Sequence, residues 1–244
     1  MNKIKLISIF CIYIIIYSCS SNVIKKEQLG NEPQSHREIE VNNLDSINEI
    51  NKNEIEVLNL AFVDLKEMPP IVYELKELKK ISLFDCNIKR IEKEIASFSK
   101  LEFLSLNGNP LEYFSPEITF LSQLKYLSID TLYATKLPEN IVQLKNLKYL
   151  SMSFNRFDEF PREVFELENL EELILKGCNL SVIPKGFSGL KKLKKIDLED
   201  NFLKKFPDDL LLIKSLEEIN IAGNPFPNEY IDSLRNVTSI KIGR

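Results

Sequence analysis

The chain has 244 residues, 44% hydrophobic and 28% charged, a composition that supplies enough apolar material for one continuous core and argues against disorder. Its formal charge is −4; without residues 1–18, which hold two lysines and no acid, 30 basic residues remain against 36 acidic ones, a charge of −6. Because phosphate contacts need clustered Lys and Arg, this balance argues against a nucleic-acid partner.

Residues 1–18 predict a secretory signal peptide. Lys3 and Lys5 form a short positive region, and an apolar run follows from Leu6 to Ile16. This run is shorter than the ~20 residues that a membrane-spanning helix needs. The pattern therefore favours a cleaved export signal over a permanent transmembrane anchor.

Cys19 is the predicted site of lipid attachment. Ile16, Ser18 and Cys19 resemble the lipobox of bacterial lipoproteins, although Tyr17 is bulkier than the residue usual there. The resemblance implies that Cys19 becomes a lipidated N-terminus, held to a bacterial membrane by several acyl chains. An ordinary signal peptide with an incidental cysteine is the alternative. Ser20 favours the outer membrane or the cell surface.

Two short segments separate Cys19 from the rest of the chain. Residues 19–37 contain few aliphatic side chains and predict a lipidated, flexible tether, which could reach at most ~60 Å when extended. Residues 38–54 carry apolar side chains at three-residue spacing and predict an N-terminal cap, either a short amphipathic helix or an irregular segment.

From Ile55 onward, apolar residues recur with a period of 23 residues. The period holds without insertion through seven full repeats and a truncated eighth, over residues 55–238. We call each repeat a coil, number the coils 1 to 8, and number the positions within a coil 1 to 23. The coils start at Ile55, Leu78, Leu101, Leu124, Leu147, Leu170, Leu193 and Leu216.

Coil 5, residues 147–169, shows the whole pattern, with Leu147 and Leu150 on the apolar positions, Asn155 at position 9 and Pro161 at position 15. It resembles the LxxLxLxxNxLxxLPxxIxxLxx pattern of the leucine-rich-repeat family. The resemblance implies an α/β solenoid, a right-handed superhelix of about eight coils whose short strands form a parallel, concave sheet. Tyr230, Ile231 and Leu234 predict a helical apolar stripe that caps the C-terminal end, and Val237, Ile240 and Ile242 could add a final strand at the tail, residues 239–244.

Position 9 predicts a polar ladder between coils. In the family, an asparagine there bonds backbone groups of neighbouring coils that would otherwise be buried without partners. Cys86 and Cys178 are small, buriable replacements with a weak donor. Val63 and Leu132 cannot serve this role, so we expect an interruption at Leu132. The matching asparagines are Asn109, Asn155, Asn201 and Asn224.

The repeat region lacks residues for catalysis. The one histidine of the chain, His36, lies in the tether, so no Ser–His or Cys–His pair can form in the coils. We expect no enzymatic activity and no cofactor. Asp197 and Glu199 belong to an acidic patch, but Lys176 and Lys195 lie in the same patch, which predicts a partly paired charged surface and no metal site.

The concave face offers the candidate binding residues. Phe103, Tyr126 and Tyr149 occupy position 3 of three consecutive coils, beside a column of serines at position 5. We interpret them as a shallow apolar trough that binds a partner, with room over the serines for an inserted side chain. Alternatively, the aromatic rings only stabilise the sheet. The predicted partner-binding residues are Phe84, Phe103, Ser105, Tyr126, Ser128, Tyr149 and Phe154.

Two functions remain open from the sequence. The first is a lipid-anchored, exported protein that binds a protein or peptide through its concave sheet. The second is a structural component of the cell envelope without a specific host-facing ligand. The oligomeric state and the identity of any ligand are left undetermined, because fold alone does not determine a partner.

Overall fold

A computed structural model describes residues 39–111 and 113–243. The predicted signal peptide, Cys19 and the tether lie outside the described residues. The chain separates into two compact units, Met1–Arg37 and Glu38–Arg244, and the account that follows concerns the second. This unit contains the whole described core, so we expect it to fold without residues 1–37.

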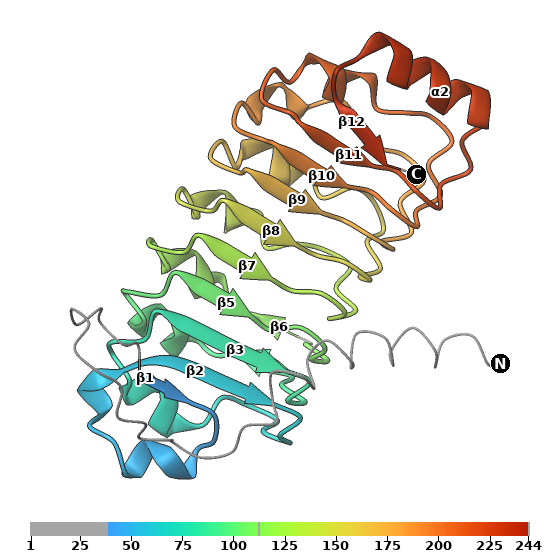
Figure 1. The fold of residues 1–244 in the computed structure, drawn as a ribbon. Coiled ribbons are helices and arrows are strands. Elements are labelled where there is room, and N and C mark those ends of the chain that lie inside the picture. Colours follow the sequence, from blue (N-terminus) through green and yellow to red (C-terminus); the bar gives the residue numbers. More distant parts are fainter. Residues whose placement is uncertain (1–38, 112, 244) are drawn as a thin grey trace, which may run out of the picture. The chain divides into compact units, whose positions relative to one another are not determined.

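A ten-stranded parallel sheet runs the length of this unit, with its strands in chain order (Figure 1). Each coil contributes one strand that includes positions 3 to 5, and equivalent residues of successive coils pair in register. The predicted parallel sheet is thus confirmed. The strands are β1 (Ile39–Val41), β2 (Ile55–Ala61), β3 (Lys80–Phe84), β5 (Phe103–Ser105), β7 (Tyr126–Ser128), β8 (Tyr149–Ser151), β9 (Glu172–Ile174), β10 (Lys195–Asp197), β11 (Glu218–Asn220) and β12 (Lys241–Gly243).

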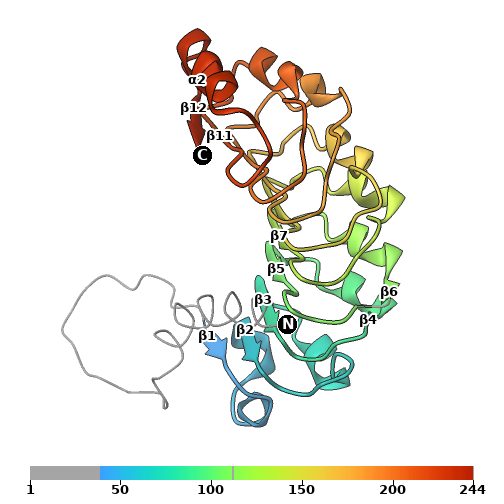
Figure 2. The ribbon, with the colours of Figure 1, turned by 90° about the vertical axis from the view of Figure 1, so that its right-hand side faces the viewer.

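Short 3-10 helices form the opposite, convex side, so the sheet lies on the concave side (Figure 2). Pro69, Pro138 and Pro161 each stand directly before such a helix, where the fixed φ of proline suits the start and its missing N–H is not needed. The helices are η1 (Asp45–Asn48), η2 (Lys52–Glu54), η3 (Pro70–Glu74), η4 (Lys93–Ser97), η5 (Pro116–Phe120), η6 (Glu139–Gln143), η7 (Arg162–Glu166), η8 (Phe187–Gly189) and η9 (Asp208–Leu212).

Coils 2 and 3 have Glu92 and Ser115 where other coils have this proline, yet both still begin a 3-10 helix. The residues just before them form an additional two-stranded sheet, β4 (Arg90–Ile91) with β6 (Tyr113–Phe114). The loss of proline therefore leaves the convex helix intact and is accompanied by one more strand pair.

The core is one continuous stack of apolar side chains. Leu101, Leu104 and Leu106 of coil 3 are fully buried, and the same positions are buried in the other full coils. Each coil therefore covers the core of its neighbours, as expected for a repeat that cannot bury its apolar face alone. No helix among the described residues is long and apolar enough to cross a membrane.

The backbone turns out of each strand through a left-handed residue at position 8. This residue is glycine in Gly108, Gly177 and Gly223, but Phe62 and Phe154 adopt the same positive φ. Because only glycine adopts this conformation without steric penalty, the non-glycine residues hold it against an unfavourable local preference. The stacking of the coils outweighs that preference.

The polar ladder at position 9 is confirmed. In Asn109, Asn155 and Asn201, the side-chain oxygen accepts bonds from the backbone N–H groups 23 and 21 residues earlier. The side-chain nitrogen donates to the carbonyls 26 and 3 residues earlier. Each asparagine thus satisfies buried backbone groups of two coils.

Cysteine and leucine change this ladder in different ways. The thiol of Cys178 contacts the carbonyl of Met152 at 3.1 Å and that of Lys176 at 3.5 Å, so it keeps the contact with the carbonyl 26 residues earlier. Leu132 is buried and has no polar side-chain atom, so the predicted interruption falls there.

The residue that follows position 9 has a left-handed backbone after Cys86, Leu132 and Cys178, a feature that the sequence analysis did not predict. These residues are Asn87, Tyr133 and Asn179.

Both ends of the core are covered. At the N-terminal end, β1 pairs with β2 and Ile47 of η1 is buried, so this cap is a strand with 3-10 turns and not an amphipathic α-helix. At the C-terminal end, α2 (Asn228–Val237) buries Ile231 and Leu234. The segment 239–244 contains β12, which pairs with β11.

Candidate functional site

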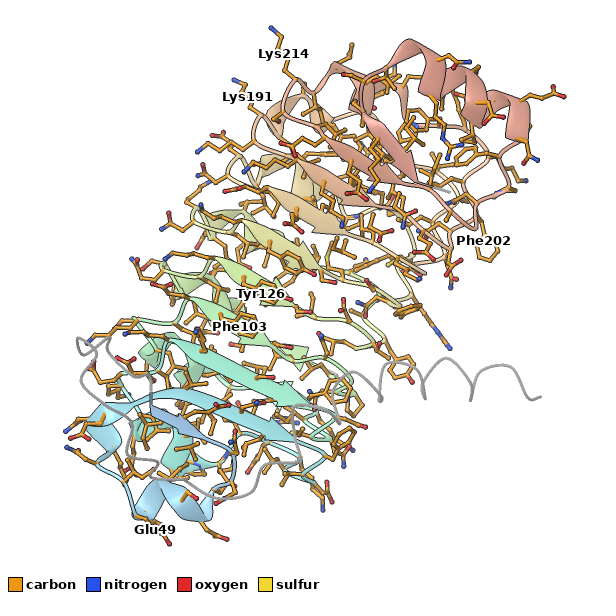
Figure 3. The ribbon with its side chains drawn as sticks, in the orientation of Figure 1. Glu49, Phe103, Tyr126, Lys191, Phe202 and Lys214 are labelled. Atoms are coloured by element: carbon orange, nitrogen blue, oxygen red, sulfur yellow. The ribbon has the colours of Figure 1, made fainter. Side chains whose placement is uncertain are left out.

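The aromatic ladder consists of Phe103, Tyr126 and Tyr149, which pair in register on successive strands. Phe103 and Tyr126 lie on the open face of the sheet (Figure 3). The ring centroids of Phe103 and Tyr126 are 4.2 Å apart, and those of Tyr126 and Tyr149 are 4.1 Å apart. The planes differ by 12° and 6°, so the rings stack face to face. In-register pairing in a parallel sheet, with strands ~4.8 Å apart, places the rings this way.

The serine column lies beneath these rings and is closed to solvent. Ser105 is 8% exposed, and Ser128 and Ser151 are each 2% exposed. The hydroxyls of Tyr126 and Tyr149 interact electrostatically with each other, and with those of Ser128 and Ser151 respectively. The predicted open trough is therefore wrong, because the rings stack over the serines and leave no room there. The face presents a low ridge of half-buried rings.

Burial sets the acidity of the ladder hydroxyls. Desolvation raises the pKa of Tyr126, and it raises the pKa of Tyr149 further, together with the hydrogen bond between the two hydroxyls. Both tyrosines are therefore neutral at physiological pH. They can contribute apolar edges and neutral hydrogen-bonding groups, but no negative charge.

Asp130 joins the two tyrosine-bearing strands and was absent from the predicted site. Its carboxylate accepts the hydroxyl of Ser151 at 2.6 Å and that of Ser128 at 3.3 Å. Because Ser128 and Ser151 also interact with the tyrosine hydroxyls, one carboxylate holds the two serines beside both rings. The in-and-out alternation of the strands would have found it, since Asp130 stands at position 7, two residues after a serine.

Phe84 and Phe154 do not form one column opposite the ladder. Phe84 is at position 7 and makes an edge-to-face contact with Phe62, at a centroid distance of 5.3 Å. Phe154 is at position 8, is 39% exposed and lies over Gly177 of the next coil. The structure therefore brings Phe103, Tyr126, Tyr149 and the serines together, and places the two phenylalanines toward the edge where the strands end.

The C-terminal part of the concave face is charged. Lys176 contacts Glu199 at 2.7 Å and Asp200 at 3.6 Å. Lys241 contacts Glu218 at 3.2 Å. Among the described residues, no group of three His, Cys, Asp or Glu side chains is arranged to hold a metal ion. The patch is therefore a partly paired charged surface.

Cys86 and Cys178 are free and fully buried. Burial raises the pKa of Cys86, and it raises the pKa of Cys178 to about 12. A nucleophilic or metal-binding cysteine needs the thiolate, which these positions disfavour. Both cysteines therefore serve packing.

A depression of about 500 Å³ lies between coils 4 and 5, away from the ladder, and Leu137, Phe157 and Arg162 are among its lining residues. It accompanies the irregular coil 4, where Ala134 occupies position 11 and the next coil has Phe157.

Comparison with known proteins finds leucine-rich-repeat proteins by both sequence and structure. A family model described as a leucine-rich repeat region matches residues 78–241. No curated protein sequence matches the chain. The leucine-rich-repeat protein LIC12759 of Leptospira interrogans is a similar solved structure, with 30% identity, a TM-score of 0.65, and coverage of 78% of this chain and 54% of that one.

Two internalins of Listeria monocytogenes are also similar. Internalin inlF has 18% identity and a TM-score of 0.66, with coverage of 84% of this chain and 57% of that one. Internalin inlC2 has 22% identity and a TM-score of 0.59, with coverage of 71% and 73%. These likenesses show the shared fold. The chain spans little more than half of the first two of these three structures.

Proposed function

This chain belongs to the leucine-rich-repeat family, and on that premise we propose that it is an exported, lipid-anchored protein that binds a protein or peptide partner through its concave sheet. The aromatic ladder carries the proposal. Three stacked rings lie half-buried on the concave face, and aromatic side chains with an apolar body and a polar end are typical anchors of interfaces.

Phe103, Tyr126 and Tyr149 are the proposed centre of the binding surface. Ser105 and Ser128 would support the rings from below, since both are buried and Ser128 is held by bonds to Asn107 and Asp130. Phe84 and Phe154 would contact the margin of a bound chain. A ridge of this kind suits a partner with a groove or an extended segment laid across the strands.

The binding test uses residues 38–244 to capture a partner, followed by Tyr126→Ala and Tyr149→Ala. Each change at a true anchor should weaken binding by ~2 kcal/mol or more. Each should also lower stability by ~0.5–1.5 kcal/mol through lost ring stacking, so correct folding is checked first. Arg162→Ala and Lys204→Ala, both away from the concave face, are the controls. Unchanged affinity in both tyrosine variants would place the site elsewhere.

Lipid attachment at Cys19 is the second part of the proposal. It is supported by the basic start, the apolar run and the lipobox-like residues before Cys19. Cells are labelled with a fatty-acid analogue, which should enter the wild-type protein and be absent from Cys19→Ala. Label that persists in the variant contradicts the assignment. Protease treatment of intact cells separates display on the outer surface from residence beneath the outer membrane.

A structural role in the envelope is the alternative. A protein of that kind would need no particular ligand, and the rings would only stabilise the sheet. Two results together would favour a structural role: the folded body retains no partner, and the variants Tyr126→Ala and Tyr149→Ala associate with the envelope as the wild type does. The partner-binding proposal predicts the opposite results.

A further inference from the structure

Asp130 has an unusual place on the concave face. It is partly buried beside the aromatic ladder, at position 7 of coil 4. Its Oδ1 accepts two short bonds, from the hydroxyl of Ser151 at 2.6 Å and from the backbone N–H of Ser153 at 2.6 Å. These two bonds hold the carboxylate in one orientation.

The second oxygen is much less engaged. Among the described residues, the contacts of Asp130 Oδ2 are long ones, with the hydroxyl of Ser128 at 3.3 Å and with Nδ2 of Asn107 at 3.4 Å. An ionised carboxylate offers about four acceptor sites. Oδ2 can therefore accept another donor without disturbing the bonds that fix Oδ1.

Asp130 also lacks a counter-charge. Within residues 39–111 and 113–243, neither a lysine nor an arginine forms an ion pair with Asp130. Lys176, two coils further along the same column, is engaged by Glu199 and Asp200. Removing a carboxylate from water without a cation is unfavourable, and burial raises the pKa of Asp130.

The part of the sheet that follows Asp130 along the chain also carries more negative than positive side chains on its concave face. Coils 6 to 8 and β12 present five carboxylates and three lysines on the concave face. In the described part of the chain, Glu172 and Asp197 have no ion-pair partner. The concave face thus combines an apolar ridge with an acidic surface that continues along the solenoid. The acidic residues are Glu172, Asp197, Glu199, Asp200 and Glu218.

We infer that the concave face takes a basic polypeptide segment, with an arginine or lysine side chain on Oδ2 of Asp130 and an apolar neighbour against the aromatic ladder. The inference rests on the proposed function and names the chemistry of its partner. An arginine fits best, because its planar guanidinium can donate to Oδ2 while its aliphatic stem covers the ring edges. Further basic residues would meet the acidic coils.

The test uses residues 38–244 and two probes, N-acetyl-arginine methylamide and its neutral analogue, N-acetyl-citrulline methylamide. The backbone amide of Ser153 donates to Asp130, so its NMR resonance reports ligand at the carboxylate. We expect the arginine probe to shift this resonance and to bind about tenfold more tightly than the citrulline probe. The preference should disappear in Asp130→Asn and persist in Asp158→Asn, a control on an exposed loop.

Different results separate this inference from the proposed function. Equal binding of the two probes, or an arginine preference that survives in Asp130→Asn, overturns the inference. A captured partner that depends on Tyr126 and Tyr149 but is indifferent to Asp130→Asn and to salt also overturns it, while the proposed function stands. A partner that ignores the ring variants contradicts the proposed function itself.

Discussion

At the scale of single residues, the left-handed position 8 shows how neighbouring coils constrain one another. Gly177 has φ +64°, and a Cβ added there would lie 2.6 Å from Cδ1 of Phe154. Gly108 has φ +76°, but a Cβ there would meet its nearest neighbour at 3.5 Å. The two glycines share a backbone requirement and differ in the space around them.

We therefore expect Gly177→Ala to be more destabilising than Gly108→Ala. Both lose about 1 kcal/mol to the left-handed backbone, and Gly177→Ala must also displace the ring of Phe154. Chemical denaturation of both variants, alone and combined with Phe154→Ala, measures the difference. The difference in unfolding free energy between Gly177→Ala and Gly108→Ala should vanish when Phe154→Ala is also present. Equal unfolding free energies of the two glycine variants without Phe154→Ala would contradict the explanation.

Asp130 predicts a particular pH dependence. Burial raises its pKa in the folded protein, so the folded state holds a proton there more tightly than the unfolded chain does. The resulting stabilisation is complete below the ordinary pKa of aspartate and is lost as pH rises through the raised pKa. The unfolding free energy of the wild type minus that of Asp130→Asn should therefore fall as pH rises from the ordinary pKa of aspartate through the raised pKa of Asp130. A rise over the same window would show that hydrogen bonds dominate over burial.

At the scale of elements, the asparagine ladder links each strand's end to the next coil. Asn201 satisfies the backbone N–H groups of Cys178 and Leu180 and the carbonyls of Leu175 and Leu198. Asn201→Leu, which imitates the natural Leu132, should lower stability by ~2–4 kcal/mol, since several buried groups lose their partners. Asn169→Ala, a half-buried control that removes the bonds to the carbonyl of Lys145 and from the ammonium of Lys192, should lose under ~1.5 kcal/mol. A comparable loss in both would contradict a special role for the ladder.

The C-terminal cap protects the last strands. Ile231 of α2 is 2% exposed, so Ile231→Ala should lower stability by ~2–4 kcal/mol. Because a solenoid depends on contacts between neighbouring coils, the loss should appear first as faster hydrogen exchange in β11 and β12. Glu229→Ala, exposed on the same helix, is the control. Uniformly faster exchange through all coils would show that the unit unfolds only as a whole.

At the scale of the whole molecule, the period of 23 residues separates the two core cysteines. Cys86 and Cys178 stand at the same position four coils apart, which corresponds to ~19 Å at ~4.8 Å per coil, beyond the ~7 Å limit for bridged Cα atoms. Thiol labelling of the unfolded, unreduced body should find both free, and the folded body should leave both unlabelled. A mass consistent with a bond between Cys86 and Cys178 would contradict the register.

Sequence pattern alone was sufficient for the fold because every coil meets the same local requirements. The spacing of leucines, the position of Asn155 and the recurrent proline at position 15 all follow from the contact between one coil and the next, which the period repeats. The interruption at Leu132 followed from its side chain alone. The N-terminal cap could not be predicted in the same way, since it lies outside the period and its three-residue spacing fits a helix as well as the observed strand.

The concave surface shows what only tertiary structure decided. The sequence placed Phe103, Tyr126 and Tyr149 in one column, but their stacking over the serines depends on ring orientation across neighbouring strands. Asp130 and Ser153 belong to different coils, and neither residue type alone indicates that they share a hydrogen-bonded network. A repeat pattern specifies which backbone positions align from coil to coil, whereas side-chain rotamers and hydrogen bonds arise only once the coils are packed together.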